Sequence, residues 1–161
     1  METGIATWLP LGFVEALAAT PHGGVLVPLA IGLLATSIVT FSVPGALTPT
    51  AFLSGLLMGF GGILVVVLGA ALGSHILFLA SRRWLSGFMR RRFGAKLDSV
   101  GDHLARRGPL YVAGARLTGV PHIVVTAGCA ATPISARSFL TASLLGMLPA
   151  ISLAAVAGSA I

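Results

Sequence analysis

The residues of this chain best suited to chemistry lie in the apolar stretch Pro109–Pro133, PLYVAGARLTGVPHIVVTAGCAATP, which carries Arg116 near its centre. The stretch is long enough to enter a bilayer, but Gly119 and Pro121 interrupt any helix within it. A charged side chain at mid-membrane depth costs about 2.5–3.5 kcal/mol on insertion scales, so it faces protein, water or a charged ligand rather than lipid. A broken helix beside an intramembrane charge is typical of a transport site. The alternative is a kinked helix whose arginine extends to the membrane surface.

Arg116 favours a ligand that carries phosphate, because the planar guanidinium group can donate two parallel hydrogen bonds to phosphate oxygens. The amino-terminal ends of half-helices beside the breaks would add partial positive charge. A phosphate headgroup could follow this polar path across the membrane while its acyl chains stay in the lipid. Weaker hydrogen-bonding groups are available on six side chains near the breaks in the two halves of the chain: Ser42, Thr48, Thr50, Thr118, His122 and Thr126.

The composition of the 161-residue chain indicates a multi-pass membrane protein. Hydrophobic residues make up 56% of the chain and charged residues 9%, whereas soluble domains carry about 25% charged residues. The single cysteine, Cys129, excludes an internal disulfide and is expected to be a small packing residue. The four acidic residues are scattered, and the sequence has no Walker-type glycine loop and no cluster of metal ligands. We therefore expect neither an enzyme nor a cofactor or metal site.

Residues 1–24 are expected to form an amino-terminal interfacial segment ahead of a single membrane domain, 25–161. The apolar run 5–20 has 16 residues and contains Glu15, which makes it too short for a hydrocarbon layer about 30 Å thick. Trp8 would anchor this helix at the membrane surface. Glu15 is interpreted as part of the polar face of the helix, and a functional carboxylate is the alternative.

Three segments are predicted to cross the membrane: Val25–Phe41, Gly61–Ser81 and Ser138–Ile161, the last of which contains Gly146 and Pro149. In the second segment, Gly69 and Gly73 lie four residues apart and form a groove where another backbone can approach closely. His75 is interpreted as a buried histidine with satisfied hydrogen bonds, and a proton carrier is the alternative.

The apolar segment Ser42–Gly59, SVPGALTPTAFLSGLLMG, is punctuated by prolines and glycines that prevent one continuous helix. Two short half-helices that meet at a turn, a re-entrant hairpin, would account for this pattern. The alternative is an exposed loop followed by an early helix start, which the absence of charge from Glu15 to His75 makes less attractive. The four residues concerned are Pro44, Gly45, Pro49 and Gly55.

Eight of the ten basic residues fall within residues 82–107, which the positive-inside rule places in the cytoplasm. An apolar face repeats at helical spacing within this run, at Phe93, Leu97, Val100 and Leu104. Segment 82–108 is therefore predicted to be a basic amphipathic linker helix that binds the anionic lipids of the inner leaflet. Nucleic-acid binding is the alternative for such a charge run, but beside a span it usually reports topology, and we expect no nucleic-acid partner.

Arg137 follows Pro109–Pro133, so both flanks of that stretch are expected in the cytoplasm, and the stretch must enter the membrane and return. The span Gly61–Ser81 then runs from outside to inside, Ser42–Gly59 dips in from outside, and Val25–Phe41 runs from inside to outside. The fold class expected is an all-α integral membrane protein with about three spans and two oppositely oriented re-entrant hairpins, an inverted repeat.

Over residues 42–150 the sequence resembles the DedA superfamily, also called SNARE-associated Golgi or VTT-domain proteins. The resemblance rests on the order and spacing of PGALTPTAFLSGLLMG, GGILVVVLGAALGSHILFLASRRW, a basic linker, RLTGVPHIVVTAG and SARSFLTASLLGMLP. Family members are known or proposed as phospholipid scramblases and as flippases of polyprenyl-phosphate carrier lipids. The resemblance places Arg116 at the position of the family's hairpin arginine and Pro121 at that of a proline after it.

Two departures from the family pattern concern mechanism. Gly119 stands where the first proline of the usual R-x-x-P would be, and Ser42–Gly59 has none of the acidic residues that DedA proper links to proton dependence. Proton coupling is therefore not expected. The substrate-binding residues expected from the two hairpins are Arg116, Thr118, Gly119, Pro121 and His122 in the second, and Pro44, Thr48 and Pro49 in the first.

The function expected is a membrane lipid translocator for a phospholipid or a polyprenyl-phosphate, in a multi-pass protein of a prokaryotic plasma membrane. A small-anion or solute permease that uses the same arginine, and a membrane scaffold that transports nothing, are the alternatives. A homo-oligomer is possible, and the sequence leaves the lipid, the direction of transport and the energy source open.

Overall fold

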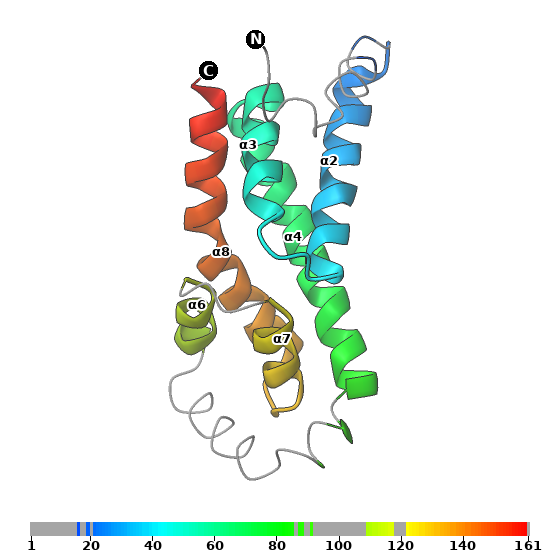
Figure 1. Ribbon diagram of the computed structural model, residues 1–161, viewed down its shortest axis with the longest axis vertical. Coiled ribbons are helices and arrows are strands. Elements are labelled where there is room, and N and C mark those ends of the chain that lie inside the picture. The colour runs from blue at the N-terminus through cyan, green and yellow to red at the C-terminus, as the bar shows by residue number, and fades with distance from the viewer. Residues whose placement is uncertain are drawn as a thin grey trace, which may run out of the picture.

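The computed structural model describes residues 21–85, 87–88, 109–117 and 122–160, with the single residues 16, 19 and 91. Within these residues every regular element is helical, and three helices are long and apolar enough to cross a membrane. The all-α membrane protein predicted from the sequence is thus confirmed. The elements in chain order are α2 (Gly23–Thr40), α3 (Leu47–Met58), α4 (Phe60–Ala80), the π-helical turn η2 (Ser81–Leu85), α6 (Pro109–Leu117), α7 (His122–Ala130) and α8 (Ala136–Ser159) (Figure 1).

Helices α2 and α4 pack with their backbones almost in contact, as the glycine groove predicted. The Thr36 hydroxyl donates hydrogen bonds to the carbonyl oxygens of Gly32, at 2.8 Å, and Gly69, at 3.0 Å. A Cβ atom placed on Gly69 would lie 2.5 Å from the Gly32 oxygen, and one on Gly73 would lie 2.5 Å from the Thr36 oxygen. Small residues at this spacing let two membrane helices approach closely enough for such bonds.

These contacts also fix the direction of α2, and the direction predicted from the sequence is wrong. Thr36 bonds to Gly69 and Thr40 bonds to Gly73, so the two helices run parallel. We expected the segment Val25–Phe41 to run opposite to α4. The positive-inside rule orients only the end of α4 that carries the basic residues, and no charged residue within α2 or at its ends indicates its direction.

The segment Ser42–Gly59 does not hold two half-helices. It holds a turn over residues 41–46 and the single helix α3. Gly45 lies in the turn with a φ of 77°, a conformation that suits glycine. Pro49 is the third residue of α3, where its missing N–H costs no helical bond, so it does not break the helix. Gly55 lies inside α3 and serves a packing contact.

The first helical hairpin is therefore built from α2 and α3, with its tip at the turn 41–46. The Thr40 hydroxyl approaches the Gly73 carbonyl oxygen at 3.5 Å, which places this tip beside the middle of α4. Gly59 then joins α3 to α4 with a φ of 59° and a ψ of −138°, a backbone conformation essentially restricted to glycine. Figure 1 shows α3 returning from the tip toward the end of the molecule where α4 begins.

The second pair of short helices, α6 and α7, lies in the opposite half of the molecule (Figure 1). Each has nine residues and is thus about 14 Å long, about half the thickness of a hydrocarbon layer of about 30 Å. The two helices occupy the stretch Pro109–Pro133, for which a helix broken near its middle was predicted. The break itself, residues 118–121, lies outside the described residues.

Helices α4 and α8 form the antiparallel centre of the fold. The rings of Phe78 and Phe139 stack with their centroids 4.5 Å apart, and both side chains are fully buried. From this stack the buried positions continue at every fourth residue along both helices: Val66, Ala70 and Ser74 on α4, and Ser143, Met147 and Ile151 on α8. The spacing of four keeps each row on one helix face.

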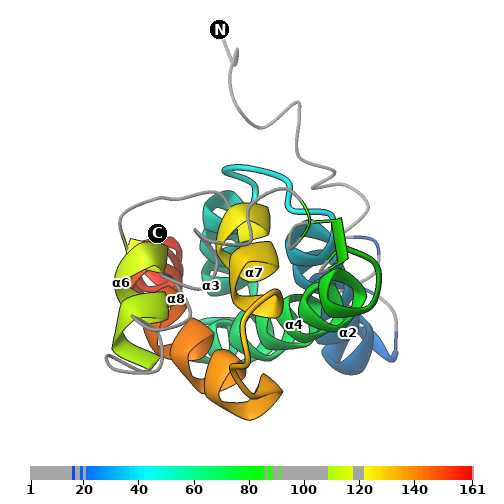
Figure 2. The ribbon, with the colours of Figure 1, turned by 90° about the horizontal axis from the view of Figure 1, so that it is seen from below.

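Helix α8 also packs on α3 without intervening side chains. A Cβ atom on Gly55 would collide with the carbonyl of Ala155, and one on Gly158 would collide with the carbonyl of Phe52. Between this contact and the Phe78–Phe139 stack, Pro149 lies inside the helix and removes one backbone hydrogen bond. Figures 1 and 2 show α8 changing direction along its length.

Two predicted features fall largely outside the described residues. They are the interfacial segment within 1–24, of which residues 1–15 are not described, and the amphipathic face Phe93, Leu97, Val100 and Leu104 of the linker 82–108. Both stay predictions.

Replacing Gly69 or Gly73 with leucine is expected to lower the melting temperature of the purified protein clearly. The new side chain would meet a backbone carbonyl of α2 that cannot move aside, and overpacking typically costs about 1–3 kcal/mol. Gly61→Leu is the matched control on the same helix, because a Cβ there meets nothing within 4 Å. Equal melting temperatures for all three variants would mean that α2 and α4 are not in contact.

Cysteine labelling from the two sides of the membrane tests the corrected topology. In a Cys129→Ala background, Ser99→Cys and Pro133→Cys are expected to label from the cytoplasmic side. His22→Cys, at the start of α2, is expected to label from the opposite side, because α2 runs parallel to α4. Labelling of His22→Cys from the cytoplasm would restore the orientation expected from the sequence. If Ser99→Cys and Pro133→Cys label from opposite sides, the chain between them crosses the membrane completely.

Candidate functional site

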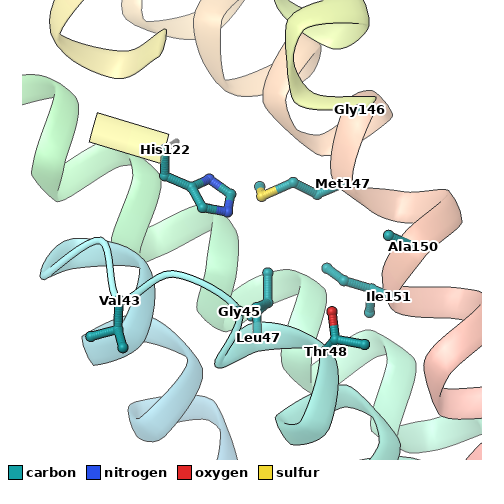
Figure 3. Close-up of a pocket in the computed structure, with 9 residues that line it drawn as sticks. All are labelled: Val43, Gly45, Leu47, Thr48, His122, Gly146, Met147, Ala150 and Ile151. Carbon is teal, nitrogen blue, oxygen red and sulfur yellow. The ribbon is translucent and has the colours of Figure 1, made fainter. Parts of the chain in front are cut away.

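A cavity of about 140 Å³ lies where the tip of the first hairpin, the start of α7 and the middle of α8 meet (Figure 3). Its lining residues on α8, from Gly146 to Ile151, lie in the middle of that helix. Nine residues line it: Val43, Gly45, Leu47, Thr48, His122, Gly146, Met147, Ala150 and Ile151.

Two of the lining side chains are polar, and they come from two different helices, α3 and α7. Figure 3 shows the imidazole ring of His122, at the first residue of α7, and the hydroxyl of Thr48, near the start of α3, directed toward the space between them. The remaining lining side chains are apolar or glycine. Few polar groups in an otherwise apolar wall are typical of ligand-binding cavities, in which the polar groups orient the ligand.

Helices α3 and α7 both begin at this cavity. The first N–H groups of a helix lack partners within the helix and carry partial positive charge. At α3 the residue before the helix, Ala46, forms no side-chain hydrogen bond with them. Neither helix has an acidic residue in its first turn. The arrangement therefore favours an anion over a cation in the cavity.

The structure brings together some of the residues predicted for the site. Thr48 and His122, which are 74 positions apart in the sequence, line the same cavity. Pro44 lies in the turn between the lining residues Val43 and Gly45. Pro49 is exposed and is not among the residues that line the cavity.

The structure describes only a part of the other residues that were predicted for the site. Arg116 belongs to the last turn of α6, six positions before His122, and its side chain lies outside what the structure describes. Thr118, Gly119 and Pro121 lie in the segment between α6 and α7, which is not among the described residues. Their role at the site stays a prediction.

The part of the site that sequence reasoning missed is the wall formed by α8, with Gly146, Met147, Ala150 and Ile151. The sequence contains a signal for it, because Gly146 and Pro149 interrupt the pattern of an otherwise ordinary span. We interpreted this segment only as a membrane crossing.

Three buried polar atoms have no hydrogen-bond partner among the described residues: Ser42 Oγ, Ser74 Oγ and His75 Nδ1. We predicted that His75 is buried with its hydrogen bonds satisfied, but its Nδ1 atom has no partner among the described residues. Ser42 lies in the turn 41–46 next to the lining residue Val43. Unpaired polar atoms inside a protein are commonly hydrated, so we expect water near this turn. The described residues contain no group of three or more His, Cys, Asp or Glu side chains that could hold a metal ion.

Comparison with protein families identifies the chain. The family model described as the VTT domain matches residues 23–160. The chain belongs to the VTT-domain family. This is the domain of the DedA and SNARE-associated Golgi proteins, so the family predicted from the sequence is confirmed, and the match includes every helix from α2 to α8. Neither the curated proteins nor the solved structures that were compared with the chain include a match.

The charge preference of the cavity of this VTT-domain protein can be measured with thiol reagents of opposite charge. In a Cys129→Ala background, the rate with an anionic methanethiosulfonate relative to that with a cationic one is expected to be higher at Thr48→Cys than at Ser159→Cys. Helix ends act on charges with about 0.3–1 kcal/mol, which corresponds to a rate ratio of about two- to fivefold. Ser159→Cys, at the carboxyl end of α8, is the control, where the ratio should not favour the anion. A ratio at Thr48→Cys that is equal to or below the ratio at Ser159→Cys would contradict an anion-binding cavity.

Proposed function

We propose that this VTT-domain protein is a membrane lipid translocator. In this proposal the phosphate headgroup of a phospholipid or a polyprenyl-phosphate crosses the membrane at the cavity between the two helical hairpins. One observation carries the proposal: the starts of two helices, α3 and α7, meet at a cavity in the middle of an apolar helical bundle.

A phosphate group that crosses the membrane needs a path lined by polar groups, because the surrounding hydrocarbon has a low dielectric constant. A phosphate that leaves water must exchange its hydration for fixed donors, because an unpaired charge in hydrocarbon is very costly. The helix starts, Thr48 and His122 supply such donors. The outer faces of α2 and α4 expose leucines such as Leu29, Leu33 and Leu68. Acyl chains can therefore remain against the protein in the lipid while the headgroup passes.

In this proposal Arg116 binds the phosphate. Its place in the last turn of α6, six positions before His122, puts its backbone at the break between the two short helices of the second hairpin. Arginine suits this role because its fork of donors matches two phosphate oxygens at once and because it stays charged.

The size of the cavity favours a second candidate, a permease for a small anion. Ligand pockets for drug-sized molecules typically measure about 300–1,000 Å³, and this cavity measures about 140 Å³. It can hold a phosphate-sized group, whereas a whole lipid headgroup would require the two hairpins to move apart. A small anion would cross without such an opening.

The environment of the protein forms part of the same proposal. We place it in the plasma membrane of a prokaryote, with segment 82–107 on the cytoplasmic side, where its basic residues would attract anionic lipid. The proposed transport requires neither a covalent step nor a cofactor.

Reconstitution of the purified protein into liposomes tests the proposal. Fluorescently labelled phospholipid or polyprenyl-phosphate in the outer leaflet is expected to move inward, so that a membrane-impermeant quencher removes less than all of the signal. Liposomes loaded with radiolabelled inorganic phosphate test the permease in parallel. Lipid movement without phosphate efflux supports the translocator, phosphate efflux alone supports the permease, and no movement of either supports a scaffold.

Substitution of Arg116 tests its role. Arg116→Ala is expected to abolish transport with a melting temperature close to that of the parent, because a residue that faces a hydrated cavity contributes little packing. Arg116→Lys should be clearly impaired, since a point charge cannot reproduce the planar fork. Arg137→Ala is the matched control, because it removes an exposed arginine near the basic end of the fold. A structural ion pair at Arg116 would instead cost about 3–5 kcal/mol on its removal, so a large fall in melting temperature would contradict the binding role.

A further inference from the structure

Arg82 makes the most specific set of polar contacts among the described residues, and the function proposed above does not use it. Its guanidinium group donates hydrogen bonds to three backbone carbonyl oxygens: Ala130 at 3.4 Å, Thr132 at 2.8 Å and Ile134 at 2.7 Å. The guanidinium carbon also lies 4.8 Å from the centre of the Phe78 ring. From the sequence, Arg82 was interpreted only as one of the basic residues that orient the chain.

The three carbonyl groups belong to the carboxyl end of α7 and to the loop that follows it. The last carbonyls of a helix have no partner within the helix and carry partial negative charge, so a cation there is favourable. The loop is closed on itself by Thr132, whose N–H and hydroxyl both donate to the Cys129 carbonyl oxygen, at 3.1 Å and 2.7 Å. This closure directs the carbonyl groups of residues 130–134 toward one guanidinium group.

Arg82 is held in place from its own side as well. The Phe78 ring on which it lies is fully buried and stacks on Phe139 of α8. Arg82 thus joins the end of α4, the end of α7 and, through the two rings, the first half of α8. Cation–π contacts and charge-assisted hydrogen bonds strengthen one another where water is partly excluded.

Among the described residues, the turn that contains Arg82 is one of the few packing partners of α7. The main partners of this helix are α4, the turn η2 and α6. At its other end, eight residues and about 12 Å away, α7 begins with His122, which lines the cavity. A short helix fixed at one end carries the residue at its other end as a rigid unit.

We propose that Arg82 is a positioning residue for the cavity. Its guanidinium group fixes the carboxyl end of α7 and thereby holds His122 and the start of α7 against the first hairpin. Arg82 does not touch the cavity itself, because its partners lie at the opposite end of α7. The link to transport rests on the function proposed above, whereas the fixing of α7 does not.

Cys129 provides a native probe of the position of α7. This residue lies in the last turn of α7, is buried, and is the single cysteine of the chain. In Arg82→Ala, loss of hydrogen bonds to a charged group should raise the rate of Cys129 alkylation by N-ethylmaleimide about tenfold or more. Arg83→Ala is the matched control, since Arg83 is the next residue of the same turn and its side chain is exposed. No change is expected there.

Restoration of the guanidinium group separates positioning from a general loss of stability. Millimolar methylguanidinium should slow Cys129 alkylation in Arg82→Ala toward the parental rate, whereas methylammonium should not, because only a planar fork reaches several carbonyl groups. Arg82→Lys should lie between the parent and Arg82→Ala for the same reason. Equal alkylation rates in the parent and Arg82→Ala would overturn the proposal.

The transport assay then tests the link to the cavity. Displacement of a binding group by about 1 Å can cost about 100-fold in rate, so Arg82→Ala is expected to transport at least about tenfold more slowly. The lipid content that gives half-maximal rate should rise as well, whereas a mere loss of folded protein would lower only the maximal rate. Faster alkylation with unchanged transport would overturn the positioning role. If the parent moves neither lipid nor phosphate, the proposed function fails, and alkylation alone decides whether Arg82 fixes α7.

Discussion

The fold depends on direct contact between helix backbones. In lipid, apolar side chains gain little from leaving their solvent, so helices associate through close packing and hydrogen bonds. Here a Cβ atom on Gly55, Gly62, Gly69 or Gly158 would collide with a backbone carbonyl of a neighbouring helix. These four contacts join α2 to α4, α4 to α3, and α3 to α8. They hold the first hairpin against both long helices, and the tip of that hairpin forms one side of the cavity.

The two halves of the chain have the same order of helices, but different contacts stabilise them. Each half contains three helices, of which the last is the longest, α2–α3–α4 and α6–α7–α8, and Figure 1 shows that α4 and α8 run in opposite directions. The first half is held by glycines. In the second half, Arg82 connects the end of α7 to α4, and a cluster that includes Phe78, Val112 and Val125 buries the short helices against the long ones. The two oppositely oriented re-entrant hairpins expected from the charge pattern stay a prediction, because α2 runs in the other direction and residues 118–121 lie outside the described residues.

Much of the fold could be predicted because hydropathy and charge are strong signals in membrane proteins. The long helices and the glycine face of α4 follow from local sequence. The direction of α2 could not be predicted, because no charged residue within it or at its ends orients it. The role of Arg82 was missed because its partners are backbone carbonyls, which every residue possesses and no sequence pattern reveals. The α8 wall of the cavity was missed because Gly146 and Pro149 mark an irregular span but do not say what it faces, which depends on tertiary packing.

Pro149 divides α8 into two helical segments, which meet at the wall of the cavity. The first segment packs on α4 through the Phe139–Phe78 stack, and the second packs on α3 through Gly158. The joint at Pro149 lies between Gly146 and Ala150, which both line the cavity. About 15 Å of helix separate Pro149 from Ser159, so a change of about 10° in the bend displaces the far end by about 2.5 Å. A small change in the bend at the cavity would thus become a shift of the α3 end of α8 relative to its α4 end.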